Sequence, residues 1–373
     1  MKRCSISKCF FLVAVLVCME FSPLGAEDVP ELLRPFAGPP ASFKVENTKY
    51  PSPLEIENGT KVQDKEEWTE RRKEIRDNWM QLMGPWPPLL SEGSLELGEV
   101  RVKDGYLEQR IHLDIAPNQK AAGWLLLPEG DGPFPSVLVV FYDPETSIGL
   151  KADKPGRDFG RLLVREGIAT LNIGTPGGNA WKPDIGKASC QPLSFHAYVA
   201  ANAWHAMAKH PKLDPERIGV TGHSYGGKWA MFAAALWDRF AAVAVSDPGI
   251  MFDETRPNVN YWEPWYLGLD PNMRRPKAGV PTKDNPRTGA YKTMIERGMD
   301  LHEIHALIAP RPFLVSGGSE DKVERWHGLH HLVQVNQILG KQDRVFMTLR
   351  DGHGPTPESN DQLAAFFKHF LKP

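Results

Sequence analysis

Residues 217–231 read R-I-G-V-T-G-H-S-Y-G-G-K-W-A-M, and the rest of the chain is interpreted from this stretch. The β-branched and apolar run over 218–221 is typical of a buried parallel strand, and the alanine-rich run over 228–236 is typical of a buried helix. Residues 222–226 between them fit G-x-S-x-G, in which only small residues fit beside the serine of a sharp strand-to-helix turn. The sequence therefore predicts a nucleophilic Ser224 at a helix N-terminus, where peptide N–H groups favour a developing negative charge.

The composition is that of a globular protein. The chain has 373 residues, of which 41% are hydrophobic and 24% charged, and its net charge is -2. This length suits one large domain or two modest ones. Because the chain has no long basic run, nucleic acid is not an expected partner.

The first 26 residues have the pattern of a secretory signal. Basic residues precede an apolar run over 10–19, and small residues at 25–26 precede two acidic ones. The run is too short to span a bilayer, so we predict export to the periplasm or the extracellular space, with no membrane span. A lipoprotein anchor at Cys18 is the less favoured alternative, since Val17 is bulky for such a site.

The cysteines are consistent with this interpretation. Cys4, Cys9 and Cys18 fall in the signal, so only Cys190 would remain after cleavage. The mature chain is then unable to form an internal disulfide. Cys190 is expected to be a buried or loop thiol.

Two regions follow the signal. Residues 27–95 form an N-terminal extension that is proline-rich over 27–60 and contains an amphipathic helix over 64–83, which is expected to pack against the main domain. Residues 96–373 form the main domain, in which strands and helices alternate. This alternation predicts an α/β fold with a mostly parallel central sheet flanked by helices. The expected strands cover 99–115, 122–127, 136–142, 168–173, 218–221, 241–246, 312–316 and 344–349, and the expected helices cover 156–167, 193–210, 228–236, 326–339 and 363–371.

Residues 250–305 interrupt this alternation and are rich in aromatic side chains. Tyr261, Trp262, Trp265 and Tyr266 lie close together in the sequence. The region is predicted to be a lid inserted over the carboxyl edge of the sheet, where ligands bind in such folds. The rings either form the insertion's own small core or face the site.

A serine, an acid and a histidine, each following a strand of one sheet, occur in the order of the α/β-hydrolase triad. His353 sits between glycines after the last predicted strand and is the expected general base, which takes the serine proton. Two carboxylates compete for the acid role. Asp321 follows the strand over 312–316, the usual place for the acid, and is preferred; Asp247 follows the strand over 241–246 and is the second choice.

The oxyanion hole is expected to use two backbone N–H groups. One belongs to Tyr225, directly after the serine. The other belongs to Tyr142 or Asp143, in the loop after the strand over 136–142.

No metal or other cofactor is predicted. The stretch H-E-I-H at 302–305 lacks the spacing of the zinc motif H-E-x-x-H. His330 and His331 are adjacent in a predicted helix and point in different directions. His223 is expected to pack inside the turn around the serine.

The stretch G-H-S-Y-G-G-K-W-A at 222–230 resembles the nucleophile region of bacterial glucuronoyl esterases, whose pattern is G-[CH]-S-R-x-G-K. The similarity continues at 55–76, at 84–88, at 309–321 and around His353. It implies the α/β-hydrolase fold and a serine-hydrolase mechanism. It also implies that Lys228 matches a lysine that holds sugar hydroxyls, although a solvated lysine is the simpler interpretation.

One position departs from that pattern. The family carries an arginine after the serine, where it helps to hold the oxyanion, whereas this chain carries Tyr225. The combination S-Y-G-G is commoner in broader esterase and peptidase branches, including acetyl xylan esterases. The resemblance therefore leaves the substrate open.

Three functions are consistent with these patterns. The favoured one is an exported serine esterase that acts on carbohydrate, on a glucuronoyl or acetyl ester of a plant or algal polysaccharide, with Lys228 and either Trp262 or Trp265 contacting the substrate. The second is a peptidase of the prolyl oligopeptidase type, whose N-terminal propeller does not fit into about 70 residues. The third is a binding protein without catalysis, against which the intact triad argues.

Overall fold

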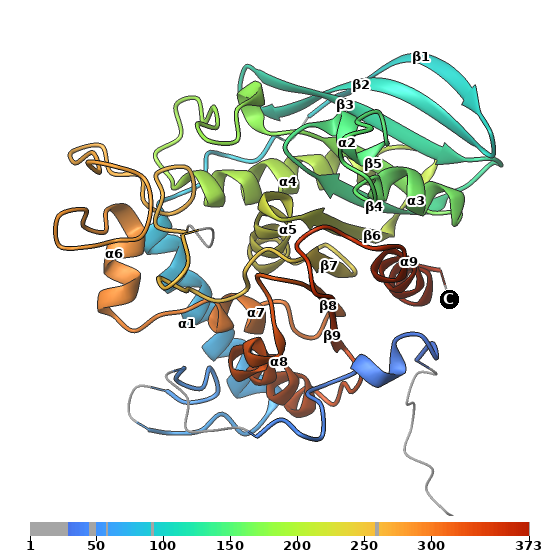
Figure 1. Ribbon diagram of the computed structural model, residues 1–373. Coiled ribbons are helices and arrows are strands. Elements are labelled where there is room, and N and C mark those ends of the chain that lie inside the picture. The colour runs from blue at the N-terminus through green and yellow to red at the C-terminus, as the bar shows by residue number, and fades with distance from the viewer. Residues whose placement is uncertain (1–28, 45–49, 57–58, 91–92, 258–260, 373) are drawn as a thin grey trace, which may run out of the picture.

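A nine-stranded sheet forms the centre of the molecule (Figure 1). The computed structural model describes residues 29–44, 50–56, 59–90, 93–257 and 261–372. The strand order is β1-β2-β3-β5-β4-β6-β7-β8-β9; β1, β2, β3 and β5 pair antiparallel, and the strands from β5 to β9 pair parallel. The strands are β1 (Leu95–Lys103), β2 (Tyr106–Ala116), β3 (Gln119–Pro128), β4 (Phe134–Val140), β5 (Ala169–Ile173), β6 (Leu213–His223), β7 (Val243–Ser246), β8 (Phe313–Gly317) and β9 (Val345–Leu349).

Helices pack on the sheet, and two further helices lie in the insertion. They are α1 (Lys65–Met83), α2 (Pro144–Ser147), α3 (Phe159–Arg165), α4 (Pro192–Ala208), α5 (Tyr225–Leu236), α6 (Gly289–Glu296), α7 (His302–Ala306), α8 (Trp326–Ile338) and α9 (Pro357–Leu371), with 3-10 turns at Arg34–Phe36, Pro176–Gly178 and Val323–Arg325. The predicted α/β fold with a mostly parallel sheet is confirmed.

Both faces of the parallel strands are buried, which explains their continuous apolar runs. Side chains alternate along β4: Val137 and Val139 pack with α3 and α9, whereas Leu138 and Val140 pack with α4 and α5 on the other face. A sheet covered on both sides exposes a usable surface only at its edges and strand ends. The carboxyl ends of the strands are therefore the place where this fold builds a site.

Several elements differ from the sequence-based prediction, and three differences have a clear description. The alternating region over 99–115 splits into β1 and β2, because Gly105 turns the chain with φ 83°. Helix α9 begins at Pro357, six residues earlier than expected, because a Thr356–Ser359 capping box stabilises its first turn. Helices α6 and α7 lie inside the insertion, where none was predicted.

The amphipathic helix of the N-terminal extension is confirmed as α1. It begins after Asp64, whose side chain accepts a hydrogen bond from the Glu67 amide. It buries a tryptophan and contacts the main domain: Trp79 Nε1 donates to Glu303 Oε2 over 2.7 Å, and Arg72 pairs with Asp238 at 2.7 Å. The extension is therefore packed onto the α/β domain.

The predicted signal over 1–26, with Cys4, Cys9 and Cys18, lies outside the described residues. Cys190 is buried, and burial raises the pKa of its thiol to about 11, as expected of an unreactive cysteine. Within the described ranges, no helix is both long and apolar enough to cross a bilayer.

Candidate active site

Four of the predicted site residues follow parallel strands of the sheet. Tyr142 comes after β4, Ser224 after β6, Asp247 after β7 and His353 after β9. Because parallel strands end at the same edge of a sheet, residues up to 211 positions apart in the chain meet there. A cleft of about 690 Å³ opens at this edge and contains all four.

The turn around Ser224 has the strained geometry expected of a nucleophile elbow. Ser224 has φ 57° and ψ −116°, a conformation that side-chain-bearing residues rarely adopt. The turn is possible only because the residues two positions before and after the serine, Gly222 and Gly226, lack side chains. A Cβ on Gly222 would lie 2.3 Å from the Gly226 carbonyl oxygen, and one on Gly226 would lie 2.1 Å from the Val140 oxygen. The glycines of G-x-S-x-G thus let β6 run directly into α5 and raise the serine hydroxyl above the sheet.

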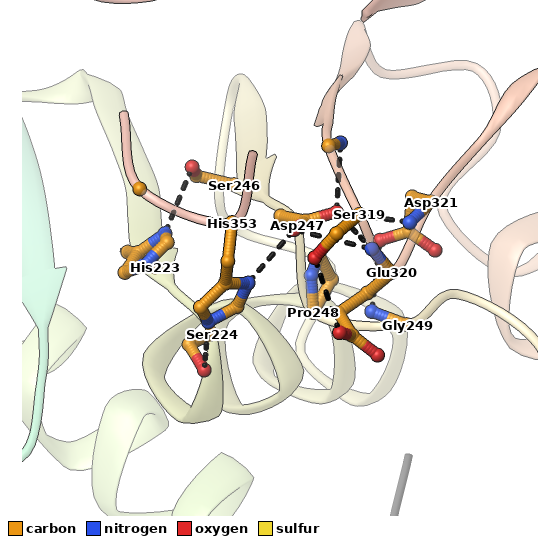
Figure 2. A network of polar contacts seen from close by, with 12 residues as sticks. His223, Ser224, Ser246, Asp247, Pro248, Gly249, Ser319, Glu320, Asp321 and His353 are labelled. Carbon is orange, nitrogen blue, oxygen red and sulfur yellow. Dashed lines mark hydrogen bonds and ion pairs between the residues drawn. The ribbon is translucent and has the colours of Figure 1, made fainter. Parts of the chain in front are cut away.

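The ring of His353 joins Ser224 to Asp247 (Figure 2). Its Nε2 lies 2.9 Å from Ser224 Oγ, and its Nδ1 lies 2.7 Å from Asp247 Oδ2. The carboxylate is fully buried, whereas the imidazole side chain is 37% exposed. A ring held in this way presents an unprotonated Nε2 to the serine hydroxyl and donates its Nδ1 proton to the carboxylate.

The preference for Asp321 as the partner of His353 was wrong. The contact with His353 is made by Asp247, the second choice. Both oxygens of Asp321 accept backbone amides instead, from Gly249 over 2.8 Å and from Ile250 over 2.6 Å. With its two oxygens directed at these amides, Asp321 supports the loop that carries Asp247.

The second oxygen of Asp247 is held by the loop after β8. Its Oδ1 accepts the amides of Gly318, Glu320 and Asp321 at 2.7, 3.1 and 2.9 Å. Asp247 itself has φ 48°, a left-handed conformation. Three N–H donors hold this carboxylate and fix the direction of the oxygen that faces His353.

Arg350 and His223 both contact His353 and support its position. Arg350 donates to the carbonyl oxygens of His353 and Gly354, both over 2.8 Å, and to Ser246 Oγ over 3.1 Å. The His223 ring packs against the His353 ring with centroids 4.6 Å apart, and burial keeps the pKa of His223 well below its ordinary value. A neutral His223 adds no charge next to the base. Sequence reasoning missed Arg350, although an arginine three residues before the predicted base was a usable signal.

Two of the backbone amides expected to form an oxyanion hole have no hydrogen-bond partner among the described residues. Tyr225 opens α5, so its N–H belongs to the first helical turn and has no intrahelical partner. Among the hydrogen bonds between described residues, none uses the amide of Tyr142, which lines the cleft. The other candidate, Asp143, caps α2 by accepting the Thr146 amide and does not line the cleft.

The side chain of Tyr225 turns away from the cleft. It is buried, and its hydroxyl forms a short hydrogen bond with His196 Nε2 on α4. His196 Nδ1 in turn contacts the Pro192 carbonyl, and burial lowers the pKa of His196 to about 4. A neutral His196 accepts from Tyr225 and donates to Pro192, so Tyr225 anchors α5 to α4.

Lys228 is buried in the first turn of α5 and lines the cleft, which excludes the solvated-lysine interpretation. Its Nζ donates to the Pro248 carbonyl and lies 5.2 Å from the ring centre of Tyr261 and 5.6 Å from that of Tyr266. Burial lowers its pKa to about 8, although nearby carboxylates oppose this effect. The lysine thus brings a weakly solvated cation to the wall of the cleft.

The aromatic insertion forms both a core and a wall. Trp262 is fully buried and packs against Tyr291, with ring centroids 6.1 Å apart, so its expected place in the site was wrong. Trp265 and Tyr266 do line the cleft. Sequence reasoning missed Trp181 and Glu263, which also line it. For Trp181, the available sequence signal was a tryptophan in a glycine-rich stretch after a predicted strand.

Within the described residues, no group of three or more His, Cys, Asp or Glu side chains is arranged to hold a metal ion. The helical histidines have other partners. His302 Nε2 contacts the Pro51 carbonyl over 2.8 Å, and His330 Nδ1 contacts the Trp326 carbonyl over 3.0 Å. The first contact attaches the extension to α7, whereas the second lies within α8.

Two family models match overlapping parts of the chain. The model of the prolyl oligopeptidase family matches residues 199–372, and that of the FrsA-like esterases matches residues 97–253. The first contains the predicted nucleophile, both aspartates and His353. The FrsA-like model begins within β1 and the prolyl oligopeptidase model ends within the last residues of the chain, so together they cover the domain from β1 to α9.

The similar proteins include esterases and a peptidase. A 4-O-methyl-glucuronoyl methylesterase of Podospora anserina is 26% identical over 86% of this chain and 67% of its own length. An uncharacterized peptidase of Bacillus subtilis is 28% identical over 32% of this chain, which spans only 18% of that protein. The solved structure of a glucuronoyl esterase from Solibacter usitatus superposes with a TM-score of 0.67 and 20% identity, over 87% of this chain and 98% of the other. The chain therefore has the α/β-hydrolase fold and, along most of its length, resembles the glucuronoyl esterases.

Proposed function

We propose that this chain is a serine hydrolase that cleaves carboxylic esters on carbohydrate through Ser224, His353 and Asp247. The observation that carries the proposal is the His353 ring, bonded to the serine hydroxyl at one nitrogen and to a buried carboxylate at the other. The cleft beside it provides space for a substrate.

The residues support a two-step acyl transfer. His353 Nε2 takes the hydroxyl proton as Ser224 Oγ attacks the ester carbonyl, and Asp247 stabilises the resulting imidazolium. The amides of Tyr225 and Tyr142 would donate to the oxyanion of the tetrahedral intermediate. The intermediate expels the alcohol, which receives the proton from His353. Water then attacks the acyl-enzyme with the same base, releasing the acid and restoring the serine.

The substrate class follows from the wall of the cleft and from the relatives. Lys228 supplies a buried cation, and Trp265 and Tyr266 supply ring faces, a combination that suits the hydroxyl and C–H surfaces of a sugar. The Podospora relative and the Solibacter structure are glucuronoyl esterases by name. We therefore assign a glucuronoyl or acetyl ester of a plant or algal polysaccharide, cleaved outside the cytoplasm as the leader sequence predicts.

A peptidase is the second candidate, and the match to the prolyl oligopeptidase family model favours it. The described residues before β1 contain a 3-10 turn and helix α1, and none of the strands of a propeller blade. The described part of the chain therefore lacks the propeller domain that restricts such peptidases to short peptides.

The decisive experiment compares wild type and Ser224→Ala on chromogenic acyl esters, glucuronate esters and peptide anilides. We expect wild type to cleave sugar esters best and the variant to lose about 10⁴-fold or more in kcat, with a residual rate from binding and the oxyanion site. An unchanged melting temperature is the control for folding. Near-normal turnover by the variant on every ester that wild type cleaves would refute the nucleophile, and a preference for anilides would favour the peptidase.

A further inference from the structure

A second tryptophan meets the lid at the open rim of the cleft. Trp181 lies in the loop between β5 and α4 and is 60% exposed, which leaves a large apolar ring in water. Its ring packs edge-to-face against Trp265 of the insertion, with centroids 5.2 Å apart and an interplanar angle of 87°. The face of an exposed indole held in this way is available to a ligand.

The loop that carries Trp181 is held in place by its own hydrogen bonds. Asn179 Oδ1 accepts the amides of Trp181 and Lys182 at 3.0 and 3.3 Å. At the other end, the Asp184 amide donates to the Pro176 carbonyl over 3.0 Å. A ring fixed by such a turn loses little conformational entropy when a ligand stacks on it.

The two indoles continue into a row of rings that leads toward the nucleophile. Trp265 lies 6.1 Å from Tyr266, and Tyr266 lies 5.8 Å from Tyr225, measured between ring centroids. Tyr225 follows the nucleophile directly in sequence, and Tyr266 lines the same cleft as Ser224. Tyr266 therefore connects the two indoles at the rim with the part of the cleft that contains Ser224.

We propose that Trp181, with Trp265 as its edge-on support, stacks a pyranose ring next to the sugar that carries the ester. The C–H face of a pyranose is electropositive and matches the negative face of an indole, while its hydroxyls stay in water at the rim. The inference rests on the proposed esterase function for the ester-bearing sugar. It makes the preferred substrate an oligosaccharide or polysaccharide ester, and Trp181 a specificity-determining residue.

Kinetics on two matched esters test this site. One probe is the methyl ester of glucuronic acid, and the other is the same methyl ester carried on xylotriose. In Trp181→Ala, the ratio of kcat/KM for the larger ester to that for the smaller is expected to fall about tenfold, the size of one stacking contact. Trp181→Phe keeps a ring and should restore the ratio to within about twofold of wild type. Leu150→Ala, which removes an exposed apolar side chain outside the cleft, is the matched control and should leave both values unchanged.

A binding measurement separates this proposal from the esterase assignment. Ser224→Ala protein, with and without Trp181→Ala, is titrated with unesterified xylohexaose and cellohexaose while tryptophan fluorescence is followed. Weakening of at least one titration by about tenfold on loss of Trp181 supports the site, even if no sugar ester is cleaved. Absence of binding by both saccharides overturns it, as does an equal loss of kcat/KM on both esters. A benzyl ester of glucuronic acid is a third kinetic probe. If Trp181→Ala lowers kcat/KM only on this ester, the proposal is overturned and the indole instead binds an aromatic alcohol.

Discussion

The loops that follow β7 and β8 each place a buried aspartate at the same edge of the sheet, yet only one of them contacts the histidine. Asp247 Oδ1 accepts amides of the β8 loop, whereas its Oδ2 contacts His353 over 2.7 Å and the Glu320 amide over 3.3 Å. Asp321 gives both oxygens to amides of the β7 loop. The two carboxylates therefore cross-link their loops, and the direction of one Asp247 oxygen toward His353 decides which of them can serve as the triad acid.

The groups around the two carboxylates also favour Asp247 over Asp321 as the triad acid. Burial and the neighbouring Asp247 charge raise the pKa of Asp321 to about 6, although Arg325, with Nε 3.9 Å from its Oδ1, opposes this effect. Asp247 has three amide donors on one oxygen and the imidazole on the other. Position after a particular strand is thus a weaker guide to the acid than the hydrogen bonds around each carboxylate.

The largest effect is expected from Asp247→Asn. An amide at this position no longer stabilises the imidazolium and favours the wrong tautomer of His353, so kcat should fall by about 10⁴-fold on the best ester. Steady-state kinetics measure this loss, and circular dichroism checks the fold. If Asp247→Asn keeps most of its activity, the pairing seen here is not the catalytic one.

Asp321→Asn should cost about tenfold in kcat, since the variant only loosens the loop that holds Asp247. Its amide oxygen replaces one acceptor, but its NH₂ group faces the other backbone N–H, so the free energy of unfolding should fall by about 2 kcal/mol. Urea unfolding and kinetics are compared on the same preparation. A 10⁴-fold loss of kcat at unchanged stability would return the acid role to Asp321.

Lys228→Met sharpens the comparison because the lysine contacts only one of the two loops by hydrogen bond, at Pro248. We expect kcat/KM on a sugar ester to fall about tenfold more than on a small acetate ester, since a buried cation that binds sugar hydroxyls has no partner on the smaller substrate. Lys322→Met, at an exposed position beside Asp321, is the control. Equal losses on both esters would assign Lys228 a structural role.

The smallest effect concerns pH. Because the pKa of Asp321 is raised in the folded state, the native protein binds a proton more readily than the unfolded chain between about pH 4 and 6. Stability from this group therefore increases as the pH falls. Between pH 7 and pH 5, wild type should gain about 1 kcal/mol relative to Asp321→Asn. Urea melts of both proteins at the two pH values measure the difference, in which the buried histidines cancel. A constant difference would contradict the raised pKa.

Sequence alone was sufficient for the features that depend on local patterns. The elbow around Ser224 could be predicted because a strand-to-helix turn has its own steric requirement, met by Gly222 and Gly226. The alternation of apolar runs predicted the parallel sheet, and chain order placed His353 after the last strand. Helix α1 followed from its periodicity and its Asp64 cap.

The tertiary structure alone decided which side chains meet in the cleft. His353 and Asp247 are 106 residues apart, and the choice between Asp247 and Asp321 depends on which backbone amides point at each carboxylate. Trp262 and Trp265 differ by three positions, yet one is core and the other lines the cleft, because the insertion has no periodic pattern that assigns its faces. Local spacing encodes the elements, whereas the directions of hydrogen bonds between distant loops are set only when those elements pack together.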